Sequence, residues 1–332
     1  MNSYERYVAT LRGKHTDFVP RVPILMQFAA ELIGSNYGAF ASNYEVLVQA
    51  NEACALEFGI DQLSCISDPY RETQGFGGII EYRTDGVPRC KSPLEEDRDL
   101  SRLQRPDPYS SERMVDRIRA VEAYRNRFKG EYSILGWVEG PAAEAADLRG
   151  TVNFLYDLMD DPDYAAELMD VTTETGIAFA LAQIEAGADT IGIGDAIASQ
   201  ISPKLYESLI LPREKRLVDA IRSHGAFVKL HICGNITHLL PGIATLEVDV
   251  LDVDHMVDLR KVREAVGSNV TITGNIDPVN GVSRGTPASI REQILSCYRS
   301  AGGRYMVNAG CEIPAGTPVE NLKALCEPIP IG

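Results

Sequence analysis

A regular alternation of helix-like and strand-like segments in the second half of the chain constrains its fold more than any other feature. Apolar residues at helical intervals occupy 163–185, 203–223 and 288–301, and each segment ends close to a glycine. Short apolar runs lie between them, at 190–193, 227–230, 250–253, 270–273 and 304–308. Strands that recur with intervening helices predict an α/β fold, because parallel neighbouring strands need long crossover connections.

The first half of the chain adds three strand-like runs, at 24–28, 62–66 and 133–137. Helix-like segments accompany these runs at 4–13, 43–58 and 111–128. Residues 79–89 place an Asp-Gly pair between two extended arms, which predicts a small hairpin insertion. Eight strands without a long linker predict one (β/α)8 TIM barrel over residues 1–332, with an N-terminal helical extension, rather than a doubly wound sheet.

One histidine and two cysteines follow predicted strands and form a candidate metal site. His231 and Cys233 are two residues apart, so both side chains point the same way at an extended strand end. Cys311 follows the last predicted strand, far along the chain. One imidazole and two thiolates are ligands that zinc favours, and an open fourth position would make the site catalytic. In a barrel these three ligands would converge, because all the strand ends face one mouth.

Several other polar residues follow the carboxyl ends of predicted strands. The candidate catalytic residues among them are Asp68, Glu139, Asp195 and Asp254. Glu139 and Asp254 are also candidates for the fourth zinc position, which water or substrate would otherwise occupy.

Each of these polar residues also has a purely structural interpretation. Asp68 precedes a proline and is suited to begin a turn. Asp195 and Asn275 are suited to cap the helices that follow them. Asn235 and Asn275, which stand in two of the strand-exit motifs, are candidate cofactor-binding residues.

The charge balance limits the partners that this chain can have. With 32 basic and 47 acidic residues the formal net charge is −15, which argues against binding to nucleic acid or to anionic membranes. The N-terminus lacks a secretory signal, and no apolar run approaches the ~18 residues of a membrane span. Seven scattered cysteines argue for reduced thiols. The expected location is cytoplasmic.

Motifs spread over nearly the whole chain resemble those of a known family. They are Ser67-Asp68-Pro69, Glu139-Gly140-Pro141, His231-Ile232-Cys233-Gly234-Asn235, Gly274-Asn275-Ile276-Asp277-Pro278 and Gly310-Cys311-Glu312-Ile313-Pro314. Together they look like the uroporphyrinogen decarboxylase superfamily, and more closely like its zinc-dependent corrinoid methyltransferase branch. That branch includes methylcobamide:coenzyme M methyltransferases and methyltransferase components of O-demethylases.

The resemblance implies a barrel with zinc on His231, Cys233 and Cys311. It also implies methyl transfer between a small substrate and the cobalt of a corrinoid, as methylcobalamin or cob(I)alamin, carried on a separate protein. The substrate is either a thiol or a methylated compound such as an aryl methyl ether. The direction of transfer stays open, with demethylation of the substrate favoured, and a homo-oligomer stays open as well.

Two alternatives accompany this hypothesis. Uroporphyrinogen decarboxylase ranks second, because 27–31 lacks the arginines with which that enzyme binds substrate carboxylates, although Asp68 matches its central aspartate. Decarboxylation would also leave the candidate metal ligands without a role. The third alternative is a barrel that binds a corrinoid or a thiol without catalysis.

Overall fold

The computed structural model describes residues 1–329, in which seven parallel strands form one curled sheet. The strands are β1 (Gln62–Ser64), β4 (Ser133–Glu139), β5 (Thr190–Gly194), β6 (Phe227–Ile232), β7 (Val250–Val253), β8 (Thr271–Thr273) and β9 (Tyr305–Met306). They pair in that order, so each strand lies beside the next one along the chain. This is the TIM-barrel type of α/β fold that the alternation predicts.

The eighth position of the barrel is filled by a short extended segment instead of the strand predicted at 24–28. Arg21 bridges to Val307 beside β9, and its carbonyl accepts a hydrogen bond of 2.8 Å from the amide of Asp61 beside β1. Pro20 and Pro23 flank this contact and have no N–H groups to donate, which limits the pairing to one bridge. The predicted strand at 24–28 was therefore wrong, and helix α2 (Gln27–Leu32) begins within its last two residues.

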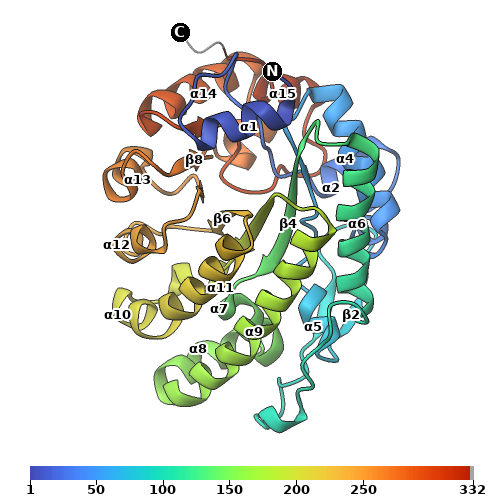
Figure 1. The fold of residues 1–332 in the computed structure, drawn as a ribbon, viewed down its shortest axis with the longest axis vertical. Helices are drawn as coiled ribbons and strands as arrows, with labels where there is room; N and C mark the ends of the chain where they lie inside the picture. The colour runs from blue at the N-terminus through green and yellow to red at the C-terminus, as the bar shows by residue number, and fades with distance from the viewer. Residues whose placement is uncertain (330–332) are drawn as a thin grey trace.

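Helices surround the curled sheet, as Figure 1 shows. The longer ones are α4 (Tyr44–Phe58), α6 (Glu112–Phe128), α9 (Pro162–Ala186), α11 (Leu211–Ser223) and α14 (Pro287–Ala301), and the shorter α13 (Leu259–Val266) also belongs to this layer. Local sequence explains their ends. In α9, for example, Asp161 caps the first turn by accepting from the amide of Tyr164, and Gly187 ends the helix with φ 117°.

Shorter elements complete the fold. The short α-helices are α1 (Ser3–Leu11), α2, α3 (Tyr37–Ser42), α5 (Arg71–Gly75), α7 (Pro141–Arg149), α8 (Thr151–Asp160), α10 (Pro203–Leu205), α12 (Leu240–Ile243) and α15 (Val319–Leu325). Short 3₁₀ turns are η1 (Leu100–Arg102), η2 (Ala196–Gln200) and η4 (Ala244–Leu246), and π-helical turns are η3 (Tyr206–Ile210) and η5 (Pro278–Ser283). The predicted hairpin is present as antiparallel β2 (Ile79–Glu81) and β3 (Arg89–Lys91).

Two departures from the predicted helices have local causes. The apolar pattern of 141–160 does not predict the helices α7 and α8 that form there, because the nearly uniform burial of α7 hides its helical period. The helix predicted at 203–223 is interrupted by the π-turn η3 just before Pro212, which has no N–H for a regular helical bond.

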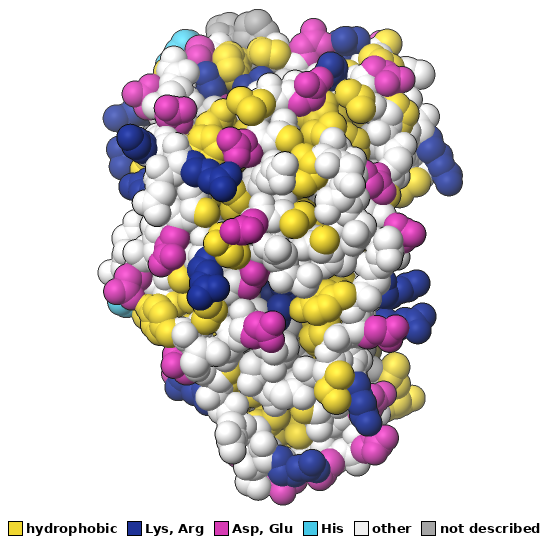
Figure 2. Space-filling view, turned by 90° about the vertical axis from the view of Figure 1, so that its right-hand side faces the viewer, with side chains coloured by type: hydrophobic (Ala, Val, Ile, Leu, Met, Phe, Trp, Pro, Cys, Tyr) yellow, Lys and Arg dark blue, Asp and Glu magenta, His cyan; other side chains and the backbone are white. Residues whose placement is uncertain are grey.

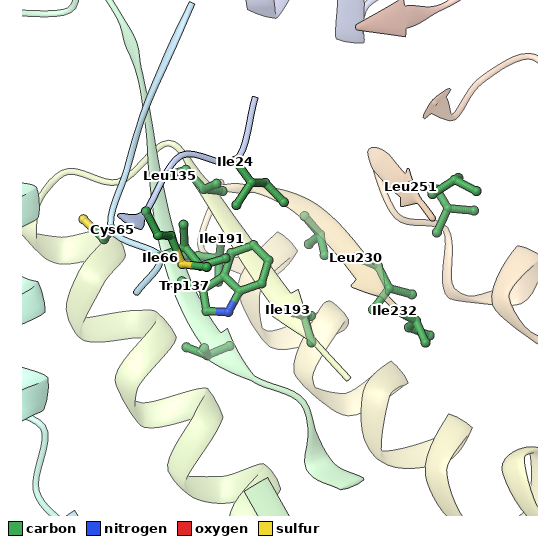
Figure 3. Packing of buried hydrophobic residues seen from close by; sticks show 14 of the residues in the cluster. Ile24, Cys65, Ile66, Leu135, Trp137, Ile191, Ile193, Leu230, Ile232 and Leu251 are labelled. Carbon is green, nitrogen blue, oxygen red and sulfur yellow. The ribbon is translucent and has the colours of Figure 1, made fainter. Parts of the chain in front are cut away.

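The core packs inside the sheet and between the sheet and the helices. Figure 3 shows side chains of this core, among them Leu135 and Trp137 of β4, Ile191 of β5, and Leu230 and Ile232 of β6. All of them are at most 3% exposed. A tightly packed core fixes the strand ends, so side chains that follow the strands are held in defined positions.

Charged side chains of both signs are distributed over the surface. Figure 2 shows basic and acidic side chains interspersed over one face of the molecule. Within residues 1–329, no helix is both long and apolar enough to cross a membrane.

Candidate metal centre and substrate cavity

Three side chains from two strand ends meet at the carboxyl mouth of the barrel. His231 belongs to β6, which extends two residues beyond the predicted run, and Cys233 follows directly. The Nε2 atom of His231 lies 3.0 Å from Cys233 Sγ, which lies 3.7 Å from Cys311 Sγ. The three ligand atoms lie within 4.8 Å of one another. They form the one cluster of three or more His, Cys, Asp or Glu ligands that residues 1–329 contain.

The chemistry of this donor set fits zinc. Two sulfurs, each about 2.3 Å from a tetrahedral zinc ion, lie roughly 3.8 Å apart, and the two thiols already approach that spacing. A hydrogen bond from Cys233 lowers the pKa of the Cys311 thiol to about 4, against the effect of burial. The same hydrogen bond raises the pKa of the Cys233 thiol, so the two cysteines hold one proton between them. A metal that bound both sulfurs as thiolates would displace this proton.

A buried polar group lies behind His231. The carboxylate of Asp252 in β7 is 3.7 Å from His231 Nδ1 and forms an ion pair of 2.7 Å with Lys229 Nζ. Asn308 donates to the same carboxylate at 3.1 Å. His231 Nδ1 is buried, has no hydrogen-bond partner within residues 1–329 and faces this carboxylate, while Nε2 faces the cysteines. In carboxylate–histidine–metal groups the carboxylate occupies the same side of the imidazole and accepts its hydrogen bond.

Gly310 allows the loop that carries Cys311 to approach the loop after β7. A Cβ atom at Gly310 would lie 2.3 Å from the backbone nitrogen of His255, in the loop after β7. Any larger residue at this position would push Cys311 away from the other two ligands.

The three ligands line one wall of a cavity of ≈160 Å³. Apolar side chains form much of its remaining wall, from Ile24, Met26, Ile66, Pro69 and Trp137. An engineered protein cavity of about 150 Å³ holds one benzene molecule, so this cavity suits a small substrate.

Three carboxyl groups also line the cavity, and two of them contact buried arginines. Asp68 forms an ion pair with Arg113, and Glu139 Oε1 lies 2.5 Å from Arg71 Nη2. Although burial opposes ionisation, the charges of Arg113 and Arg71 lower the pKa of Asp68. Burial raises the pKa of Glu139 to about 8 and outweighs the opposing effect of Arg71.

The third carboxyl group is that of Glu312, which is not among the predicted site residues. It directly follows Cys311, lines the cavity, and accepts a hydrogen bond of 3.0 Å from the amide of Gln27. Burial raises its pKa to about 7. Arg71 and Arg113 were missed as well. The position of Glu312 next to a metal ligand was a usable signal, whereas nothing in the sequence links the arginines to the strand ends.

Two other predicted site residues hold loops around the centre. The Asp254 carboxylate accepts from the amides of Gly234 and Met256, at 2.9 and 3.1 Å, and so fixes the loop after Cys233. The amide of Asn275 donates to the carbonyls of Asp254 and Val257, at 3.0 and 2.6 Å. Neither side chain is part of the cavity lining.

The remaining two are also absent from the cavity lining. Asp195 is fully buried and accepts from the amides of Ala142 and Ala143, at 3.3 and 2.8 Å, at the start of α7. Asn235 accepts from the amide of Thr237 in an exposed turn. The structure therefore brings Asp68 and Glu139 to the cavity with the metal ligands, and the other four predicted residues to the surrounding loops.

The fold and the site define a TIM-barrel protein with a candidate His-Cys-Cys metal centre at the carboxyl ends of its strands. The family described as "Uroporphyrinogen decarboxylase (URO-D)" matches residues 2–329, and the chain belongs to this family. The family resemblance seen in the sequence motifs is confirmed.

Relatives within the family carry two kinds of name. A methylcobamide:CoM methyltransferase MtbA from Methanosarcina acetivorans is 32% identical, over 97% of this chain and 96% of the relative. A uroporphyrinogen decarboxylase from Synechococcus sp. is 26% identical, over 96% of each chain. The solved structure of a methyltransferase from Methanosarcina mazei superimposes with a TM-score of 0.89, at 24% identity, over 98% of this chain and 97% of that one. The similarity to this solved structure confirms the fold.

Proposed function

We propose that this protein is a zinc-dependent methyltransferase that moves a methyl group between a small substrate and the cobalt of a corrinoid carried by a partner protein. The observation that carries the proposal is the meeting of His231, Cys233 and Cys311 on the wall of a benzene-sized cavity. The methyltransferase names among full-length relatives support it.

His231, Cys233 and Cys311 would hold the zinc ion, which supplies an electron-accepting position for a substrate sulfur or oxygen. The contacts of the nearby carboxylates support leaving the fourth position to the substrate. Asp254 uses both of its oxygens on backbone amides, and Glu139 pairs with Arg71.

A carboxyl group of the cavity would donate a proton to the substrate or accept one from it. When a methyl group leaves a substrate oxygen or sulfur, the carbon–heteroatom bond breaks and the electron pair stays on that atom. Glu139 lines the cavity and has a pKa of about 8, so it would carry a proton at neutral pH and would donate it to that atom. In the reverse direction its carboxylate would accept the proton of a thiol.

The walls of the cavity would position the substrate and exclude water. Trp137 and Met26 are at most 9% exposed and offer apolar surface beside the ligands. Such a site suits a methyl or aryl group more than a hydrated one.

Uroporphyrinogen decarboxylation remains the second candidate, because Asp68 lines the cavity and decarboxylases occur among the relatives. One observation weighs against it. None of the described residues that line the cavity is a lysine or arginine able to pair with substrate carboxylates.

The deciding experiment mixes zinc-loaded protein with free cob(I)alamin and a panel of methyl donors, including aryl methyl ethers and methyl thioethers. We expect the methylcobalamin absorbance to grow with one of these donors, and to stay at the uncatalysed rate with Cys311→Ser protein. A matched control is Cys297→Ser, which changes a cysteine outside the ligand set.

Other results would redirect the assignment. Turnover of uroporphyrinogen by metal-free protein, abolished by Asp68→Asn, would establish the decarboxylase. Tight corrinoid or thiol binding without any methyl transfer would leave a binding barrel.

A further inference from the structure

We propose that Trp137 is the specificity-determining residue of the cavity, and that its indole holds an aromatic ring of the substrate beside the metal ligands. The inference rests on the proposed function, because it concerns the substrate of the same site. It deepens that function by naming the substrate class, an aryl compound, whether its reacting atom is oxygen or sulfur.

The first observation is the space that β5 leaves for the indole. Trp137 of β4 and Gly192 of β5 are partners in neighbouring strands. A Cβ atom at Gly192 would lie 2.2 Å from indole Cε3, and one at Gly194 would lie 3.0 Å from Cζ2. The indole therefore occupies space that a side chain at Gly192 would fill, and glycine within a strand commonly marks such a close approach.

The second observation is the way in which the backbone of Trp137 is held. Gln183 of α9 is fully buried, accepts a hydrogen bond of 2.9 Å from the Trp137 amide, and donates one of 3.0 Å to the Trp137 carbonyl. A Cβ atom at Gly136 would lie 2.8 Å from Gln183 Oε1, so a glycine permits this contact as well. Trp137 is thus fixed through its backbone and through its ring.

The third observation relates the indole to the metal ligands. Gly194, which the indole approaches, pairs directly with His231 in β6. Trp137, Gly194 and His231 all line the cavity. Because Gly194 has no side chain, a group that lies against the indole is adjacent to the position that the metal ligands surround.

The fourth observation is the apolar surface beside the indole. Ile66 and Met26 line the same cavity and are at most 9% exposed. Aromatic pairs are stabilised beyond the effect of buried area, and methionine sulfur also contacts aromatic rings favourably. This wall therefore favours a planar aromatic ring over an alicyclic ring of similar size.

The test uses two matched pairs of ligands. Methoxybenzene is compared with methoxycyclohexane, and (methylthio)benzene with (methylthio)cyclohexane, so that only the ring differs within each pair. Zinc-loaded protein is titrated with each compound, and calorimetry gives the Kd. Trp137 is the only tryptophan of the chain, so tryptophan fluorescence reports whether the ligand lies against this indole. Neither readout requires turnover.

We expect the aryl member of each pair to bind with a Kd at least about fivefold lower than that of its alicyclic partner. The aryl compounds should also change the tryptophan emission. A cyclohexyl ring has more apolar surface than a phenyl ring, so hydrophobic burial alone would favour the alicyclic compounds. The expected order therefore reports an aromatic contact.

Variants test the role of the indole itself. Trp137→Leu should bring the two Kd values of each pair to within about twofold of each other. Trp137→Phe, which keeps an aromatic ring, should retain a preference for the aryl compounds. Phe154→Leu is the matched control, because it removes a fully buried aromatic ring of α8 that is not part of the cavity lining. If Trp137→Leu does not fold, the Kd values and the emission of the wild-type protein still decide the matter.

Three results would overturn the inference: equal or tighter binding of the alicyclic compounds, aryl binding without a change in emission, and no binding of any of the four. Each would leave the methyltransferase proposal intact, because the cobalamin assay measures methyl transfer separately. An aryl preference in protein that transfers no methyl group from any donor would overturn the proposed function alone.

Discussion

Cys233 and Cys311 bring their Sγ atoms to 3.7 Å although they follow different strands, β6 and β9. Two strands of the barrel, β7 and β8, separate them in the sheet. The contact exists because the sheet curls and the Cys311 loop folds inward over Gly310, whose missing side chain lets it approach the backbone of His255. Metal binding is therefore expected to depend on both cysteines equally.

Replacing either cysteine should empty the metal site. We expect Cys233→Ser and Cys311→Ser proteins to lose zinc, because two remaining ligands hold zinc far more weakly than three. Elemental analysis after purification measures the zinc content, with Cys297→Ser as the matched control. One zinc per chain in both ligand variants would exclude this centre.

Asp252 should act on the metal through His231. We expect Asp252→Asn to weaken zinc affinity about 10–100-fold, because the carboxylate behind Nδ1 is lost. Competition with a chromogenic chelator measures this affinity. The change also leaves Lys229 unpaired in the core, so the double variant Asp252→Asn/Lys229→Met serves as the control. Unchanged affinity in both proteins would deny Asp252 a positioning role.

Glu139 should set the upper pH limit of the reaction. Its pKa is raised by burial to about 8, so it is protonated below that pH and can donate. Above pH 8 the proton is lost, and the demethylation rate should fall. A pH–rate profile between 6 and 10 tests this, and Glu139→Gln should lower the rate and remove the transition. A profile that is flat in the wild-type protein would exclude Glu139 as the donor.

The raised pKa of Glu139 also predicts how the free energy of unfolding depends on pH. The folded state holds a proton that the unfolded state releases near pH ~4.3, so stability should fall as pH rises from about 4 to 8. Urea denaturation of the wild-type and Glu139→Gln proteins at pH 5 and pH 8 compares the two slopes. The variant should lose less stability over this interval than the wild type.

The ion pair of Arg113 with Asp68 should matter for folding. Both side chains are at most 2% exposed, and Arg113→Met leaves the Asp68 charge buried without its partner. We expect a loss of about 3–5 kcal/mol in the free energy of unfolding. Lys215→Ala, which removes an exposed i,i+4 pair with Asp219, should cost no more than about 0.5 kcal/mol. Urea denaturation measures both, and similar small losses would contradict this role for Arg113.

Much of the barrel could be predicted from the sequence because it follows from local rules. Helices and strands leave periodic apolar patterns and end at residues with suitable backbone geometry, as Gly187 does after α9. The exception at 24–28 arose because apolar content alone does not make a strand. Pro20 and Pro23 lack the N–H groups that a strand ladder needs. The free-energy cost of these missing hydrogen bonds can be judged only when the neighbouring strand is known.

The sequence by itself determined the residue types at the barrel mouth, including His231, Cys233 and Cys311, because each follows a recognisable strand. Only the tertiary structure decided which of the polar residues face a common cavity. The Asp254 carboxylate accepts hydrogen bonds from backbone amides, whereas the Glu312 side chain lines the cavity. No local sequence pattern encodes this difference. The physical reason is that the environment of a side chain at a strand end depends on loops from distant parts of the chain, and their meeting is set by the curvature of the whole sheet.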